Sequence, residues 1–87
     1  MARVWVPTQF RSLCGGAVEI DVPGLTLDAV LHAVDERCPG FYDSVVEDGR
    51  VRAELAVAID GEAAQYALFE SVRPDAALTI IPAIGGG

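Results

Sequence analysis

The residues that could take part in chemistry lie at the end of the chain, where Pro82-Ala83-Ile84 is followed by Gly85-Gly86-Gly87. No side chain in this run can act as an acid, a base or a nucleophile, so its reactive group is the terminal carboxylate of Gly87. Six extended residues reach roughly 20 Å, and glycine has no Cβ that would keep the run out of a narrow channel. A C-terminal carboxyl group, with a pKa of about 3.5, is ionised at neutral pH and resists nucleophiles. The pattern therefore predicts a group that a partner enzyme must activate.

The other reactive side chains are few and scattered. Cys14 and Cys38 form no CxxC pair and have no clustered histidine, so no metal site is predicted. The sequence does not decide whether the two cysteines form a disulfide, but two reduced thiols are the stronger interpretation. Cys38 is expected in the core and Cys14 in a turn. His32 falls off the apolar stripe of its predicted helix and is expected in solvent. The sequence shows no set of acid, base and nucleophile residues that could form an active site. We therefore expect the chain to have no catalytic residue, no bound cofactor and no enzyme activity of its own.

Composition limits the possible partners. The chain has 87 residues, the size of one domain, and 52% hydrophobic against 22% charged residues indicate a packed globule. The formal net charge of −7 repels phosphate backbones and anionic bilayers, so we expect neither nucleic acid nor membrane as a partner. The apolar stretch Val4-Trp5-Val6 is broken at Pro7 and does not resemble a signal peptide, which favours a cytoplasmic protein.

The start of the chain is predicted to form a hairpin. Residues 3–10 alternate in the manner of a strand, and Cys14-Gly15-Gly16 is typical of a turn. Residues 17–22 alternate again and are expected to form the second strand. Val4, Val6 and Phe10 fall on one parity of the first strand, and Val18, Ile20 and Val22 are expected to point inward from the second.

A helix is predicted next. Thr26 is typical of an N-cap, and Asp28 places a negative charge in the first turn, where the helix dipole favours it. Cys38-Pro39-Gly40 should end the helix. Its apolar stripe would consist of Leu27, Val30, Leu31, Val34 and Cys38.

The second half of the chain is predicted to hold three strands after an irregular or briefly helical stretch at residues 41–50. The turn pair Asp60-Gly61 favours a tight hairpin between the first two of these strands. Leu78 and Ile80 are expected to point inward from the last strand. The strands are expected at residues 53–60, 63–69 (a short edge strand) and 77–81, with further turns at Asp48-Gly49 and Pro74-Asp75.

The order strand, strand, helix, strand, short strand, strand predicts an α+β fold. One amphipathic helix must cover one face of a mixed sheet of four to five strands. This is the order of a β-grasp, or ubiquitin-like, roll. By analogy with that fold, the first and last strands would lie side by side and parallel at the centre of the sheet. We expect a β-grasp domain over residues 1–82 and a flexible glycine-rich tail over residues 83–87.

Several motifs along the chain resemble one family. They include Val6-Pro7-Thr8 with Arg11, Gly15-Gly16, the helix start Thr26-Leu27, residues 57–62, and the tail from residue 80 to residue 87. A strand followed by proline, an apolar residue and terminal glycines is the specific part of the pattern. On these residues the chain resembles the ThiS/MoaD family of ubiquitin-like sulfur-carrier proteins, and within it most the CysO type.

The resemblance implies a mechanism in which this chain is a cosubstrate. An E1-like adenylyltransferase of the MoeB/ThiF type would consume ATP to adenylate Gly87, and a sulfur donor would displace AMP to leave a thiocarboxylate. Gly85 and Gly86 would thread the partner's active site. A sulfur-accepting synthase would then take the sulfur for cysteine, molybdopterin, thiamin or a thio-containing natural product, and the CysO type favours cysteine.

A docking face is expected beside the tail. If the first and last strands are neighbours, Trp5, Thr79 and Ile81 share the outward face, and Ala56 and Ala58 extend it. An exposed aromatic residue with small apolar neighbours suits partner contact. The residues expected to contact partners are Trp5, Ile81, Pro82 and Ile84.

Two other functions stay open. A ubiquitin-like modifier would start from the same adenylate and form an isopeptide bond between Gly87 and a lysine of another protein. A binding-only β-grasp subunit would not need its last two glycines at all.

Overall fold

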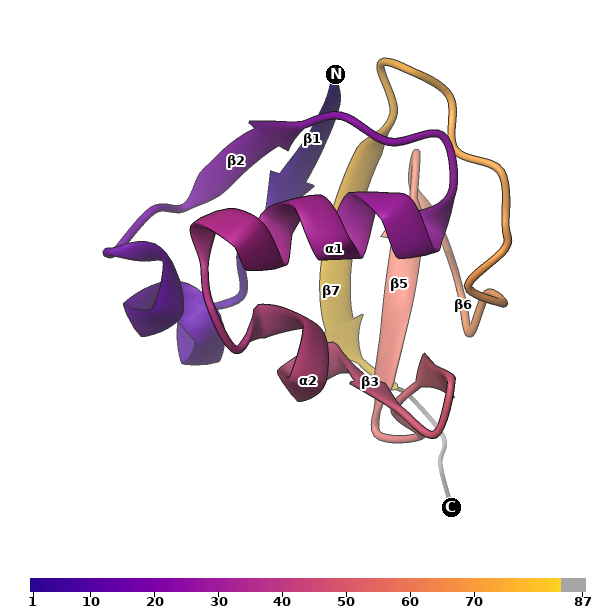
Figure 1. Cartoon of the computed structure of the whole chain (residues 1–87). Coiled ribbons are helices and arrows are strands. Elements are labelled where there is room, and N and C mark those ends of the chain that lie inside the picture. Colours follow the sequence, from indigo (N-terminus) through magenta and orange to yellow (C-terminus); the bar gives the residue numbers. More distant parts are fainter. Residues whose placement is uncertain (84–87) are drawn as a thin grey trace.

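In the computed structural model, which describes residues 1–83, five strands form one sheet and helix α1 lies across one of its faces (Figure 1). The helices are α1 (Leu27–Arg37), α2 (Phe41–Val45) and the 3-10 helix η1 (Thr8–Cys14). The strands of the sheet are β1 (Ala2–Trp5), β2 (Glu19–Val22), β5 (Leu55–Ile59), β6 (Glu62–Ala64) and β7 (Ala77–Pro82). A separate small hairpin consists of β3 (Val46–Glu47) and β4 (Arg50–Val51).

The sheet order is β2-β1-β7-β5-β6, so β7 is the central strand. β1 runs parallel to β7 with Val4 opposite Leu78, and the other described pairs of this sheet are antiparallel. The predicted α+β fold of β-grasp type is confirmed, as is the parallel pairing of the first and last strands. Because β1 and β7 point the same way, Met1 and Ala83 lie at opposite ends of the sheet (Figure 1).

The first strand is shorter than the sequence predicts. β1 ends at Trp5 because Pro7 has no N–H to continue the ladder, and Thr8–Cys14 then forms a 3-10 helix. Gly15 ends this helix with φ of 64°. Phe10, expected at the end of the first strand, instead packs from η1 against Phe41 with ring centroids 5.9 Å apart.

The second strand also starts later than predicted. Regular pairing begins at Glu19 opposite Trp5, after the chain has left η1 through the turn at Gly15-Gly16. Ile20 and Val22 are buried as expected, but Val18 lies before the ladder and is 46% exposed. The prediction that Val18 points inward is therefore wrong.

Helix α1 forms the second layer as predicted. The Thr26 Oγ1 accepts the N–H of Ala29 at 3.1 Å, which is the N-cap hydrogen bond, and Asp28 lies in the first turn. With 11 residues α1 is the longest helix described, and none of the described helices is long and apolar enough to cross a bilayer. Its fully buried stripe against the sheet is Leu27, Val30, Leu31 and Val34.

Cys14 and Cys38 are joined by a disulfide, which corrects the prediction of two reduced thiols. The 3-10 helix turns the chain back so that Cys14 lies against the end of α1, with 4.6 Å between the two Cα atoms. Cys38 is fully buried, as predicted, and Cys14 is half-buried. The proximity depends on η1, which replaced part of the predicted strand, so the spacing of the cysteines did not indicate it.

Two tight turns match their sequence signals. Asp48-Gly49 joins β3 to β4 and Asp60-Gly61 joins β5 to β6. All four residues have positive φ, between 51° and 89°, as two-residue hairpins of type I′ require. The expectation of a brief helix before the first of these turns is met by α2.

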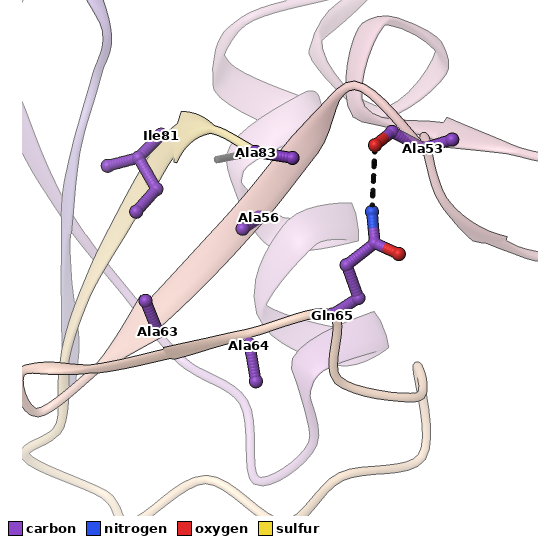
Figure 2. A pocket seen from close by; sticks show the side chains of 7 residues that line it. All are labelled: Ala53, Ala56, Ala63, Ala64, Gln65, Ile81 and Ala83. Atoms are coloured by element: carbon purple, nitrogen blue, oxygen red, sulfur yellow. Dashed lines mark hydrogen bonds between the residues drawn. The ribbon is translucent and has the colours of Figure 1, made fainter. Parts of the chain in front are cut away.

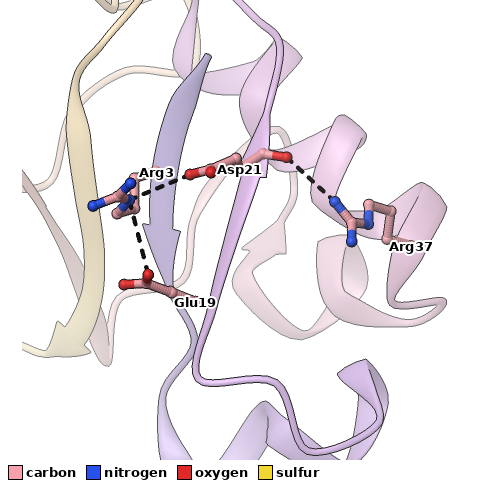
Figure 3. Close-up of polar contacts among 4 residues, drawn as sticks. All are labelled: Arg3, Glu19, Asp21 and Arg37. Atoms are coloured by element: carbon pink, nitrogen blue, oxygen red, sulfur yellow. Dashed lines mark hydrogen bonds and ion pairs between the residues drawn. The ribbon is translucent and has the colours of Figure 1, made fainter.

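Polar contacts tie β2 to its neighbours (Figure 3). The Arg3 Nε donates to Asp21 Oδ1 at 3.3 Å and lies 4.0 Å from Glu19 Oε1. Arg37, at the end of α1, donates to the carbonyl oxygen of Asp21 at 3.3 Å. Exposed ion pairs of this kind contribute little stability.

We expect reduction of the Cys14–Cys38 bond to lower the free energy of unfolding by about 3 kcal/mol. The bond joins residues that are 24 positions apart in the sequence, so it closes a loop that restricts the unfolded chain. Urea unfolding with and without reductant measures the difference. A Cys14→Ala/Cys38→Ala variant is the control, since reductant should leave its midpoint unchanged. An equal midpoint for the oxidised and reduced wild-type chain would contradict the disulfide.

Candidate functional site

The outer sheet face, which is the face that α1 leaves uncovered, carries a row of small and aromatic side chains across four strands. Trp5 lies opposite Thr79, and Thr79 lies opposite Ala58 on the other side. Ala58 in turn lies opposite Ala63 of the edge strand. Trp5 is 44% exposed, which is unusual for tryptophan in a chain of this size. The predicted sharing of one face by β1 and β7 residues is confirmed.

A groove runs along the same face beside the end of β7 (Figure 2). Ile81 lies opposite Ala56, two positions beyond Thr79, and most side chains around it are methyl groups that leave the space above them empty. The groove has a volume of about 390 Å³. It carries no charged side chain, so its chemistry suits apolar contact and not catalysis. Its lining residues are Ala53, Ala56, Ala63, Ala64, Gln65, Ile81 and Ala83.

The chain leaves the sheet at the rim of this groove. Pro82 lies opposite Leu55, and the Ala83 N–H donates to the carbonyl oxygen of Glu54 at 2.9 Å. This bond fixes the last described residue to the turn that precedes β5. The predicted roles of Ile84 and of Gly85-Gly86-Gly87 lie outside the described residues and stay predictions, as does the domain boundary at residue 82.

Gln65 supports the point at which the chain leaves. Its Nε2 donates to the carbonyl oxygens of Arg52, Ala53 and Leu55 at 3.1, 3.1 and 2.7 Å, and Figure 2 draws the bond to Ala53. These bonds hold the turn before β5, in which the Glu54 carbonyl binds Ala83. Sequence reasoning missed Gln65, because nothing in its neighbouring residues indicates that its side chain binds carbonyl oxygens 10 to 13 residues earlier in the chain.

A second hollow flanks Trp5 on the other side. It is about 310 Å³ in volume and lies where the chain passes from β1 into η1. The Arg11 Nε donates to the carbonyl oxygen of Val6 at 3.0 Å, which holds the guanidinium at this hollow. The residues around this hollow are Trp5, Val6, Pro7, Thr8, Arg11 and Thr79, which include the motif singled out in the sequence.

Asp60 fixes the opposite end of β7. Its Oδ1 accepts the N–H of Ala77 at 3.0 Å and its Oδ2 lies 3.2 Å from the Arg73 guanidinium. The hydrogen bond from Ala77, with a smaller effect of Arg73, holds the pKa of Asp60 below its usual range. The turn thereby anchors the strand that carries the tail.

A cluster of titratable groups lies elsewhere, on α1 and α2. The His32 ring stacks on Tyr42 with centroids 3.9 Å apart, and the Tyr42 hydroxyl donates to Asp28 at 2.5 Å. Burial, followed by the hydrogen bond to Asp28, raises the pKa of Tyr42 to about 12. His32 is exposed, as predicted. None of the three residues lines the groove, so the cluster is not part of the candidate site.

Comparisons with known proteins agree with this geometry. The model of the ThiS family matches residues 4–87. A chain in the crystal structure of the BexX/CysO complex from Amycolatopsis orientalis is 26% identical, with 100% of both chains covered and a TM-score of 0.90. CysO from Mycobacterium tuberculosis is 21% identical, with 97% of this chain and 100% of that chain covered and a TM-score of 0.89.

SAMP1 from Haloferax volcanii is a third similar structure. It is 27% identical, with 99% of this chain and 98% of that chain covered and a TM-score of 0.70. No significant match was found among curated protein sequences.

Replacement of Gln65 by alanine should loosen the point at which the chain leaves the sheet. We expect Gln65→Ala to lower the free energy of unfolding by about 1 kcal/mol, since three carbonyl oxygens, including the part-buried one of Leu55, lose their donor. Amide hydrogen exchange at Ala83 should also become faster. The control is Gln9→Ala, which changes an exposed glutamine of η1. Equal exchange rates at Ala83 in the two variants would contradict the role of Gln65.

Proposed function

Because the chain belongs to the ThiS family, we propose that it is a sulfur carrier whose Gly87 carboxylate is adenylated and then converted to a thiocarboxylate. The observation that carries the proposal is the extent of the family match, which runs from residue 4 through the last glycine and so includes Gly85 and Gly86. At the coarser level, the chain is a ubiquitin-like sulfur carrier or modifier.

The first step activates a poor electrophile. An oxygen of the Gly87 carboxylate attacks the α-phosphorus of ATP and pyrophosphate leaves, which gives an acyl-adenylate. The sulfur of a hydrosulfide equivalent then attacks the acyl carbon, the bond to the phosphate oxygen breaks, and AMP leaves with the electron pair. The product is a thiocarboxylate on Gly87. An E1-like adenylyltransferase would bind the ATP and supply the catalytic groups, and this chain would bind no cofactor.

The body of the protein would act as the recognition surface for that enzyme. Trp5 lies beside Thr79 on the outer sheet face, and Ile81 lies two residues further along β7. Ala83 at the groove rim is the point from which the last four residues start. Those residues reach at most ~14 Å when extended. The activating enzyme must therefore bind close to the groove for Gly87 to enter its active site, threaded by Gly85 and Gly86.

The partners proposed are the E1-like adenylyltransferase, a sulfur donor and a sulfur-accepting synthase. The Amycolatopsis orientalis structure is of a complex between BexX and CysO, which supports a chain that works while bound to other proteins. Similarity to CysO favours cysteine synthesis as the acceptor pathway over molybdopterin, thiamin or thio-containing natural products. We place the activation in the cytoplasm because it consumes ATP.

The second candidate function is protein modification through Gly87, which similarity to SAMP1, a small archaeal modifier protein by name, favours. Both functions share the adenylate and differ in the nucleophile that displaces AMP. A binding-only subunit is the remaining alternative.

Intact mass measurement separates these functions. The chain is incubated with an E1-like adenylyltransferase from its own genome, ATP and sulfide, and we expect exchange of one oxygen for one sulfur, confined to the C-terminal peptide. A chain truncated after Gly85 and a reaction without ATP are the controls. A chain that consumes ATP and gains no sulfur, but appears attached to lysines of other proteins, would instead be a modifier. Equal activity of the truncated chain would favour the binding-only subunit.

Substitutions on the outer sheet face test the docking surface. We expect Trp5→Ala and Ile81→Asp each to raise the KM for the carrier in adenylation about tenfold, or ~1.4 kcal/mol of binding, with kcat nearly unchanged. Phe69→Ala and Leu25→Asp are matched controls, because both change exposed apolar residues away from this face. Unchanged kinetics for Trp5→Ala and Ile81→Asp would show that partners bind elsewhere.

A further inference from the structure

All six basic side chains of the chain are arginines, at positions 3, 11, 37, 50, 52 and 73. Since lysine and arginine together number six, the sequence contains no lysine amine. A lysine ammonium, with a pKa of about 10.4, releases some free amine at neutral pH, and that amine attacks activated acyl groups. A guanidinium stays protonated and delocalised, so it does not.

In the described part of the chain, the cysteine and tyrosine side chains are also not available as nucleophiles. Cys14 and Cys38 are bonded to each other, and Cys38 is fully buried. The Tyr42 hydroxyl donates to Asp28, and the Tyr66 hydroxyl donates to the carbonyl oxygen of Glu62 at 2.7 Å. Burial is the largest cause of a raised pKa at both phenols, so neither is ionised at neutral pH.

The amine of Met1 is separated from the chain's own tail by the fold. The register sets Arg3 opposite Ala77, so Met1 lies near the start of β7 and Ala83 follows its end (Figure 1). At about 3.3 Å per residue, the distance from the level of Ala77 to that of Ala83 is roughly 20 Å. Four further residues span at most ~14 Å, so Gly87 of the same molecule cannot reach this amine.

From these features we infer that the chain is a donor only: none of its own side chains can accept, as an amide, the acyl group that is activated at Gly87. The inference rests on the proposed function. In the reaction it excludes, an amine lone pair attacks the acyl carbon of the adenylate, AMP leaves with the bonding electrons, and the amine proton passes to water. The resulting amide would consume the carrier permanently. If the chain acts as a modifier, no copy would be joined to a side chain of another copy, because no copy offers a lysine to the next.

The arginines themselves provide the test. Arg50 is exposed on β4, and the hollow that it lines shares Ala53 and Gln65 with the groove from which the tail starts. Arg73 pairs with Asp60 near the start of β7, at the other end of the sheet. Arg50→Lys and Arg73→Lys therefore introduce an amine near to the tail and far from it, and both conserve charge.

The three chains are incubated with the adenylyltransferase and ATP, without a sulfur donor, and analysed by intact mass. We expect the wild-type chain to release pyrophosphate and to form no adduct on any of its side chains, so that any slow wild-type dimer is joined through the Met1 amine. Arg50→Lys should lose the mass of one water by reaction within a molecule, or form covalent dimers. Arg73→Lys should form dimers alone. Self-adducts of the wild-type chain at a rate equal to that of Arg50→Lys would overturn the inference.

A second measurement does not need the activating enzyme. Acetylation of the folded chain with an amine-selective N-hydroxysuccinimide ester should add one acetyl group, at Met1, and iodoacetamide without reductant should add nothing. More than one stable acetyl group, or alkylation of either cysteine, would overturn the inference. Failure of the wild-type chain to release pyrophosphate with the enzyme would count against the proposed function and leave this result standing.

Discussion

The parallel hydrogen-bonded pairing of β1 with β7 is the contact on which the rest of the structure depends. It joins the two ends of the sequence at the centre of the sheet and sets Val4 against Leu78 in the core beneath α1. The same register sets Trp5 beside Thr79 on the outer sheet face. Because the strands are parallel, β7 runs away from Met1 and ends at the rim of the groove on the outer sheet face.

The molecule thus separates recognition from chemistry. The described part offers an apolar groove, an exposed indole and a main chain that is held by hydrogen bonds up to Ala83. The proposed reactive group is a carboxylate four residues further on, with no catalytic power of its own. A rigid body with a short tail limits where an activating enzyme can bind. The absence of lysine adds a second constraint, on the nucleophile. Because the chain has no side-chain amine, the nucleophile that attacks the activated Gly87 in the proposed reaction must come from another molecule.

Local rules accounted for the features whose causes lie within a few residues. The apolar stripe of α1, the N-cap at Thr26 and the turn at Asp60-Gly61 follow from periodicity and from backbone preference. The parallel central pair came from fold analogy, since periodicity does not specify strand partners. The 3-10 helix, the Cys14–Cys38 bond and the contacts of Gln65 depend on groups that only the complete fold brings together, so sequence spacing did not predict them.

The central claim is that Gly87 supplies the reacting oxygen, and isotope transfer tests it most directly. A chain whose Gly87 carboxylate carries ¹⁸O, prepared by hydrolysis of a C-terminal thioester in labelled water, is turned over with the adenylyltransferase, ATP and sulfide. The account predicts that AMP acquires ¹⁸O, because a carboxylate oxygen bridges to the α-phosphorus and leaves with it. AMP that forms at the same rate without label would contradict activation at Gly87.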